Sequence, residues 1–128
     1  MGIKVLVADD QEIIRRGVRS LLTEDPEIEL VGEATSFAET VQMVERLTPQ
    51  VVVLDLHMKD EVKLTSLEIK SHLNINALVI AMSLWNDSET KQLAESLGAV
   101  TLLDKAELVS TLVPTIKQFA SRDSRILT

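Results

Sequence analysis

Two short stretches decide the fold of this chain: IKVLVADD at residues 3–10 and VVVLD at residues 51–55. Each is a run of apolar residues, rich in β-branched side chains, that ends in aspartate. An apolar run at consecutive positions, rather than at every second one, is typical of a strand buried on both faces of a parallel sheet. Both stretches are therefore predicted to be buried strands, and their acidic ends are predicted to lie at one edge of the sheet.

Strands and helices are expected to alternate along the rest of the chain. Further strands are predicted at residues 28–34, 77–82 and 100–103. Apolar residues at helical spacing predict a helix after each strand. These helices are expected around residues 13–22, 37–47, 64–69, 88–97 and 107–120.

Several residues give signals for helix ends. Ser36, followed by Glu39 three residues later, predicts a capping box at the start of the second helix. Asp87 or Ser88 is expected to cap the fourth helix, and Gly98 to end it. Pro114 lies inside the last helix and is expected to kink or split it.

This order predicts an α/β fold of five βα units. The expected architecture is a doubly wound, five-stranded parallel sheet in the order 2-1-3-4-5, which is flavodoxin-like. A chain of 128 residues is long enough for one domain. We expect that domain to span residues 1–121, with residues 122–128 as a polar tail or the start of a linker.

The composition excludes several classes of protein. The chain has 20 acidic and 13 basic residues, which argues against a DNA-binding surface, and it has no cysteine for a disulfide or thiolate site. The two histidines, His57 and His72, are too few and too far apart for a transition-metal site of their own. No apolar run is long enough to cross a membrane, and no signal peptide is recognisable. A cytoplasmic location is the expectation.

Three carboxylates are expected to converge at the carboxyl edge of the sheet. Asp9 and Asp10 end the first strand and Asp55 ends the third, and those strand ends are neighbours in the predicted order. Closely packed like charges repel unless a cation joins them. Oxygen ligands without histidine or cysteine suit a hard cation, Mg²⁺ first.

Two further side chains are expected at the same edge: Ser83 after the fourth strand and Lys105 after the fifth. A metal and an ammonium group can neutralise a transferring phosphoryl group, and a hydroxyl can hydrogen-bond it. One carboxylate must then be the nucleophile, and Asp55 fits best because it follows the central strand.

The motifs VLVADD (5–10), VVVLDLHM (51–58), VIAMS (79–83) and GAVTLLDK (98–105) resemble the receiver domain of two-component response regulators (CheY-like). The resemblance covers essentially the whole chain and is strongest for receivers of LuxR-type transcriptional regulators. It implies that Asp55 is the phosphoacceptor, with a sensor histidine kinase or a phosphotransfer protein as donor.

The resemblance also implies a role for each site residue. Asp10, Asp55 and the backbone carbonyl of His57 would bind Mg²⁺, and Asp9 would act through a metal-bound water. Ser83 and Lys105 would contact the phosphoryl group and report it to the face formed by the fourth helix, the fifth strand and the last helix.

That same face is expected to support a homodimer, with Leu97, Leu102 and Leu108 as apolar contacts. A kinase would use the first helix. LuxR-type regulators carry a DNA-binding domain after the receiver, which these residues do not include. This domain itself is expected to contact neither nucleic acid nor membrane.

Three departures from the family pattern are present, and two of them, the altered loop and the missing aromatic, leave a second hypothesis open. Lys59-Asp60-Glu61-Val62-Lys63 stands where the family has a proline and a glycine-bearing loop, Ala106 stands where a proline with a cis bond is usual, and Leu102 replaces the switch aromatic. A trans bond is expected before Ala106. A pseudo-receiver that binds proteins without being phosphorylated is therefore the alternative.

Two classes of enzyme are disfavoured by the residues that follow the acidic strands. A dehalogenase-type phosphatase needs aspartate where His57 stands, and a dinucleotide enzyme needs a glycine-rich turn after the first strand. We therefore expect a signalling domain and not a turnover enzyme. The side chain of His57 is expected to be exposed. Trp85 either covers apolar surface or overhangs the acidic pocket.

Overall fold

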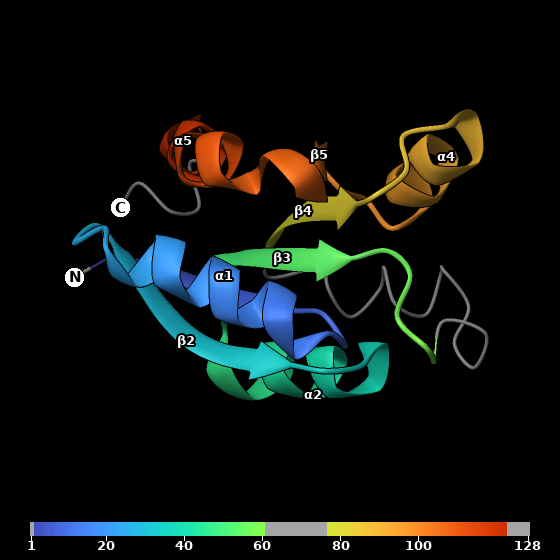
Figure 1. Cartoon of the computed structure of the whole chain (residues 1–128). Coiled ribbons are helices and arrows are strands. Elements are labelled where there is room, and N and C mark those ends of the chain that lie inside the picture. Colours follow the sequence, from blue (N-terminus) through green and yellow to red (C-terminus); the bar gives the residue numbers. More distant parts are fainter. Residues whose placement is uncertain (1, 61–76, 123–128) are drawn as a thin grey trace.

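The computed structural model of the chain describes residues 2–60 and 77–122 (Figure 1). Its sheet is parallel and has the predicted order β2-β1-β3-β4-β5. The strands are β1 (Ile3–Ala8), β2 (Ile28–Ala34), β3 (Val51–Asp55), β4 (Leu78–Ser83) and β5 (Thr101–Asp104). The doubly wound α/β prediction is therefore confirmed.

The helices of the described residues follow the strands as predicted. They are α1 (Glu12–Thr23), α2 (Phe37–Leu47), α4 (Ser88–Ser96) and α5 (Leu108–Arg122), with a short 3-10 helix, η2 (Lys105–Glu107), before α5. The helix predicted around residues 64–69 lies outside the described residues, as does the tail from residue 123.

Among the described residues, α1 and α5 cover one face of the sheet, and α2 and α4 lie on the other (Figure 1). Alternate residues of each central strand supply the two cores, because successive side chains of a strand point to opposite faces. Val5, Val7, Val51 and Val53 pack with residues of α1 and α5, whereas Leu6, Ala8, Val52 and Leu54 pack with residues of α2 and α4. This two-sided burial explains why these strands are apolar at every position.

Side-chain caps begin two helices where the sequence predicts them. Ser36 Oγ accepts a hydrogen bond from the Glu39 backbone N–H at 3.0 Å. The Glu39 carboxylate accepts from the backbone N–H of Thr35 at 2.7 Å, one residue before the predicted partner of a capping box. Asp87, not Ser88, caps α4 by accepting from the Thr90 N–H at 2.8 Å. Gly98 follows α4 with a φ of 76°, which glycine adopts readily.

Of the two outcomes predicted for Pro114, a kink or a split in the last helix, the split does not occur, because α5 runs unbroken through Pro114. Proline removes one backbone hydrogen bond, whose acceptor would be the carbonyl of Ser110. Pro114 and Ser110 both lie on the exposed side of α5. An exposed carbonyl can bond to water, so the helix continues.

Leu97 and Leu108 are not surface contacts, contrary to the sequence-based expectation. Both are buried, in the cores on opposite faces of the sheet, and Leu102 is partly buried against the core that α2 and α4 cover. The exposed apolar groups in this region are Val100 and Val109. Each of these two leucines continues the apolar side of its own helix, and that side packs against the sheet.

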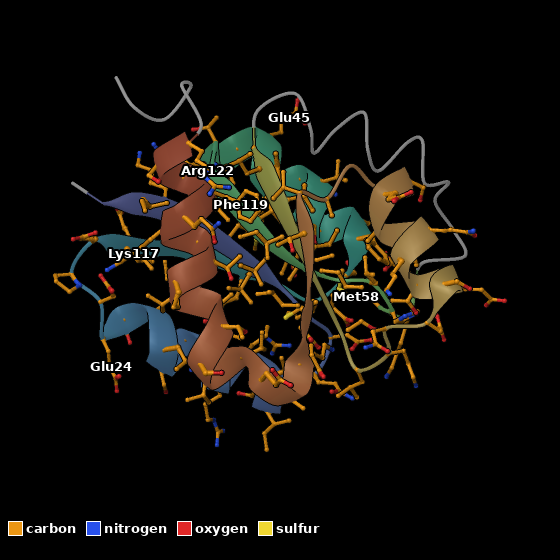
Figure 2. All side chains as sticks on the ribbon, turned by 90° about the horizontal axis from the view of Figure 1, so that it is seen from above. Glu24, Glu45, Met58, Lys117, Phe119 and Arg122 are labelled. Carbon is orange, nitrogen blue, oxygen red and sulfur yellow. The ribbon has the colours of Figure 1, made fainter. Side chains whose placement is uncertain are left out.

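An ion pair ties α5 to the loop before β2, at the amino edge of the sheet. Lys117 Nζ lies 2.7 Å from Asp25 Oδ2 and 3.6 Å from Glu27 Oε2. Figure 2 shows Lys117 reaching from α5 toward this loop, with Glu24 nearby at the end of α1. This edge is remote from the acidic strand ends.

We predict that Leu112→Ala lowers the free energy of unfolding by about 2–5 kcal/mol, because the leucine side chain is fully buried and its loss leaves a cavity. Val109→Ala, on the same helix, is the matched control. Val109 is 83% exposed, so its truncation should change stability by less than about 0.5 kcal/mol. Urea denaturation of both variants measures the difference, and equal losses would contradict the packing described here.

Candidate functional site

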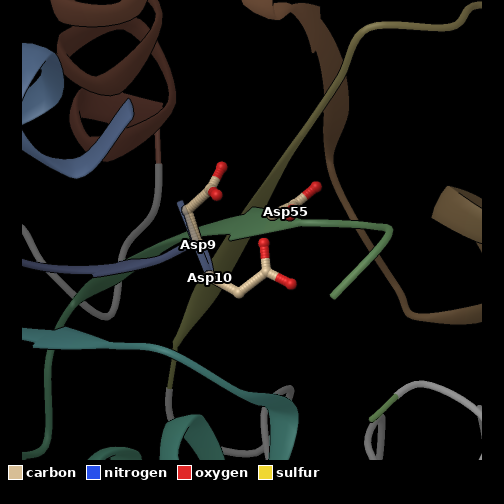
Figure 3. Close-up of side chains that lie close together, drawn as sticks. All are labelled: Asp9, Asp10 and Asp55. Atoms are coloured by element: carbon tan, nitrogen blue, oxygen red, sulfur yellow. The ribbon is translucent and has the colours of Figure 1, made fainter. Parts of the chain in front are cut away.

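Three aspartates meet at the carboxyl edge of the sheet (Figure 3). Asp9 and Asp10 directly follow β1, and Asp55 is the last residue of β3. The parallel register pairs Ala8 with Leu54, which places these strand ends side by side. One carboxylate oxygen from each aspartate lies within 4.8 Å of the others. The predicted convergence of the three carboxylates is therefore present.

Lys105 supplies the positive charge for this cluster. Its Nζ lies 2.7 Å from Asp9 Oδ2 and 3.1 Å from Asp55 Oδ1. The Asp9 side chain is fully buried, and the side chains of Asp55 and Lys105 are 4% and 6% exposed. The ammonium group thus bridges two carboxylates that are nearly out of contact with solvent.

Burial and mutual charge shift the ionisation of this group of residues. Burial raises the pKa of Asp55 above its ordinary value, and the adjacent charge of Asp9 raises it further. Burial alone would lower the pKa of Lys105, but the hydrogen bond to Asp9 and the charges of Asp55 and Asp9 outweigh it, so that pKa is raised. Lys105 therefore stays protonated while the carboxylates compete for its charge.

Backbone groups orient each carboxylate. Asp9 Oδ1 accepts from the Gln11 N–H at 2.8 Å, and Asp55 Oδ1 accepts from the His57 N–H at 3.1 Å. Asp10 Oδ2 accepts from the Lys59 N–H at 3.1 Å. These bonds fix the carboxylates in place before any ligand arrives.

Ser83 is also at the predicted edge. It ends β4, is 1% exposed, and pairs in register with Asp104, the residue before Lys105. Its Oγ accepts a hydrogen bond from the Trp85 backbone N–H at 3.0 Å. This bond holds the hydroxyl at the carboxyl end of β4, beside the strand that leads to Lys105.

His57 and Trp85 are in contact beside the cluster. Their rings meet edge to face with centroids 4.8 Å apart, and Trp85 is 55% exposed. The expectation that the His57 side chain is exposed is wrong, because the side chain is partly buried at this contact. Trp85 therefore packs against His57, the second residue after Asp55.

The donor set fits a hard divalent cation. All three side chains offer only carboxylate oxygens, and the cluster lacks sulfur and imidazole ligands. Lys105 engages Asp9 Oδ2 and Asp55 Oδ1, and Lys59 engages Asp10 Oδ2. Among the described residues, no hydrogen bond or ion pair engages Asp55 Oδ2 or Asp10 Oδ1, which are therefore the oxygens best able to bind a metal.

The structure also describes the two other departures from the family pattern, at Ala106 and Leu102. The described residues contain no cis peptide bond, so the bond between Lys105 and Ala106 is trans, as predicted. Leu102 lies on β5 and packs against the core that α2 and α4 cover.

Two features of the site were missed by sequence reasoning. Arg15 donates from Nη1 to the carbonyl of Asp9 at 2.8 Å, and its Nε lies 3.5 Å from Glu33 Oε1. The Asp60 carboxylate accepts from the backbone N–H groups of Phe37 and Ala38, at 2.9 and 3.1 Å. Neither contact has a local sequence signal, because the partners are brought together only by the fold.

The chain matches the response regulator receiver domain over residues 5–117. It is 28% identical to the transcriptional regulatory protein LiaR of Bacillus subtilis over 126 residues, which are 97% of this chain and 59% of that protein. It is 34% identical to a protein-glutamate methylesterase/protein-glutamine glutaminase of Shewanella frigidimarina over 82% of this chain and 27% of that protein. The chain thus spans only part of the length of these relatives.

Solved structures share the fold. The apo receiver domain of RcsB from Salmonella enterica serovar Typhimurium superposes with a TM-score of 0.81 at 21% identity, covering 95% of this chain and 90% of that one. The receiver domain of the response regulator NarL from Mycobacterium tuberculosis gives 0.75 at 23% identity, covering 91% and 97%.

None of the helices in residues 2–60 and 77–122 has the length and hydropathy to span a membrane. The family match extends over nearly all of the described residues and includes the three aspartates, Ser83 and Lys105. The chain belongs to the response regulator receiver domain family, whose members accept phosphoryl groups in two-component signalling.

Proposed function

We propose that this domain accepts a phosphoryl group on Asp55 from a histidine kinase or phosphotransfer protein, in a reaction that requires Mg²⁺. The observation that carries the proposal is the Lys105 ammonium group, which forms ion pairs with both Asp9 and Asp55. Asp10 lies beside them as the third carboxylate of the cluster. A buried nucleophile, a cation and a metal-binding carboxylate pair are the parts that phosphoryl transfer to a carboxylate needs.

In the proposed reaction, a carboxylate oxygen of Asp55 attacks the phosphorus of the donor's phosphohistidine. The bond between phosphorus and the imidazole nitrogen breaks, and its electron pair leaves with the imidazole. Lys105 is already placed to neutralise negative charge at Asp55, since its Nζ is 3.1 Å from Oδ1. The hydroxyl of Ser83, held at the same edge by Trp85, would hydrogen-bond a phosphoryl oxygen.

Mg²⁺ would be held by Asp10, Asp55 and the backbone carbonyl of His57, with Asp9 acting through a bound water. The metal would supply positive charge that offsets the charge of the acidic cluster and the phosphoryl group. Asp9 stays fixed by the Gln11 N–H and by Lys105, which suits a residue that contacts the metal indirectly.

Phosphorylation is proposed to change the α4-β5-α5 face through Lys105 and Ser83. Lys105 begins η2, the short connection between β5 and α5, and Ser83 is the last residue of β4, directly before the connection to α4. A shift of either group toward a phosphoryl oxygen would therefore move an end of that face. A homodimer through this face would use exposed groups such as Val100 and Val109.

We further propose that this receiver unit, residues 1–121, is the input part of a cytoplasmic regulator, with residues 122–128 as a tail or linker. The similarity to LiaR, a transcriptional regulatory protein longer than this chain, supports a DNA-binding output. The unit would act as a signalling domain without turnover of its own. Methylesterase relatives show that receivers also occur in enzymes.

The second candidate is a pseudo-receiver that binds partners without phosphorylation. It is favoured by Lys59-Asp60 in the loop after β3 and by Leu102 in place of an aromatic residue. It is disfavoured by the complete set of Asp9, Asp10, Asp55 and Lys105 in contact.

We predict that the protein gains one phosphoryl group when it is incubated with Mg²⁺ and acetyl phosphate, and that Asp55→Asn gains none. The amide is a poor nucleophile but has the shape of the carboxylate. Asp25→Asn, at the opposite edge of the sheet, is the matched control and should be phosphorylated as the wild type is. Intact mass spectrometry with and without Mg²⁺ measures each case.

An unmodified wild-type protein that also fails to bind beryllofluoride would support the pseudo-receiver. An unmodified protein that binds beryllofluoride would indicate a phosphate too short-lived to observe by mass.

We predict that Lys105→Met slows phosphorylation by at least about 100-fold, because a preplaced charge at the transferring group is lost. The same variant should lose about 3–5 kcal/mol of stability, since two buried carboxylates are left without their counter-ion. Added Mg²⁺ should restore more stability to the variant than to the wild type, because it offsets the same charges.

Lys117→Met, which removes a lysine from the far edge of the sheet, serves as the control and should leave the phosphorylation rate unchanged. Rates from time-resolved mass spectrometry and urea midpoints with and without Mg²⁺ decide the outcome. A Lys105→Met protein that reacts at the wild-type rate would show that the ammonium group has no part in the transfer.

A further inference from the structure

We propose that Asp60 is a positioning residue for the phosphorylation site: by binding the N-terminus of α2, its carboxylate holds residues 57–60 against the acidic cluster. The inference rests on the proposed function, because the site that it positions is the Mg²⁺-dependent phosphoacceptor. It adds a residue that lies outside the cluster and is contributed by the loop after β3.

The Asp60 carboxylate bridges two parts of the chain that are distant in sequence. Oδ1 accepts from the Phe37 N–H at 2.9 Å, and Oδ2 accepts from the Ala38 N–H at 3.1 Å. These N–H groups belong to the first turn of α2, where backbone donors have no partner within the helix and negative charge is favoured. Asp60 thus uses both oxygens in charge-assisted bonds.

This cap is separate from the local cap of the same helix. Ser36 Oγ accepts from the Glu39 N–H at 3.0 Å, and the Ser36 carbonyl accepts from the Thr40 N–H at 3.0 Å. The helix therefore has its own N-cap residue. The bonds from Asp60 satisfy the two donors that Ser36 does not reach.

The other end of the segment is attached to the acidic cluster. The His57 N–H donates to Asp55 Oδ1, and the Lys59 N–H donates to Asp10 Oδ2, each at 3.1 Å. Between them, Met58 is buried in the core that α2 and α4 cover, and Figure 2 labels it there. A proline at position 59 would have no N–H to give to Asp10.

Each residue of the segment 57–60 therefore has its own anchor. The first bonds to Asp55, the second is buried in the core, the third bonds to Asp10 and the fourth bonds to the start of α2. Asp60 is next to Lys59, so release of its carboxylate from α2 removes the restraint closest to the Lys59–Asp10 bond. Asp10 and the His57 carbonyl are the proposed metal ligands that depend on this segment. Loss of a residue that orients metal ligands weakens metal affinity by about 10- to 100-fold in other proteins.

The test compares Asp60→Ala with Ser36→Ala, which removes the other side-chain cap of α2 without touching the loop after β3. Both variants should lose stability to urea, because each leaves helix N–H groups without a side-chain acceptor. Only Asp60→Ala should weaken Mg²⁺ binding, by about tenfold, and Ser36→Ala should stay within about twofold of the wild type. Titration with MgCl₂, followed by Trp85 fluorescence and by calorimetry, measures the affinity.

Two further measurements separate positioning from loss of fold. Asp60→Asn keeps an acceptor oxygen, so it should recover part of the Mg²⁺ affinity. At saturating Mg²⁺, Asp60→Ala should be phosphorylated by acetyl phosphate to the same extent as the wild type. The inference would be overturned if Asp60→Ala bound Mg²⁺ as tightly as the wild type does, or if Ser36→Ala lost as much affinity as Asp60→Ala. In either case, phosphorylation of the wild type would leave the proposed function intact. A wild type that neither binds Mg²⁺ nor reacts would overturn both.

Discussion

The structure depends on one electrostatic constraint: two carboxylates, of Asp9 and Asp55, lie side by side where almost no water reaches them. Such a pair is unfavourable unless a cation shares both, because like charges interact strongly away from solvent. Lys105 meets this need with contacts of 2.7 and 3.1 Å. Asp10, at the open side of the pair, adds a third carboxylate and makes the cluster a site for a second, divalent cation.

The fold explains why this cluster forms where it does. In a parallel sheet the carboxyl ends of neighbouring strands meet at one edge, so β1 and β3 deliver their aspartates together while β4 and β5 bring Ser83 and Lys105. At the opposite edge of the sheet, Lys117 forms an ion pair that joins α5 to the loop before β2. The acidic cluster and the Lys117 ion pairs thus lie at opposite ends of the same strands.

The strands, their order and the five side chains of the site could be predicted from sequence because they depend on local patterns. Continuous apolar runs mark β1 and β3. The aspartates that follow these runs must lie at the carboxyl ends of the strands, because they are the next residues along the chain. The features that failed depend on tertiary context. Pro114 is tolerated because it lies on the exposed side of α5, and Leu97 and Leu108 turn inward. The contacts of Asp60 and Arg15 join segments that only the fold brings together.

The central claim is that the constrained pair yields a nucleophile at Asp55, and the most direct measurement is to locate the acyl phosphate chemically. Borohydride reduces an aspartyl phosphate to homoserine, which marks the residue permanently. After incubation with acetyl phosphate and Mg²⁺, peptide mass spectrometry should find homoserine at position 55 and unmodified aspartate at positions 9 and 10. Homoserine at position 9 or 10, or none in a protein that has gained a phosphoryl group, would contradict the account.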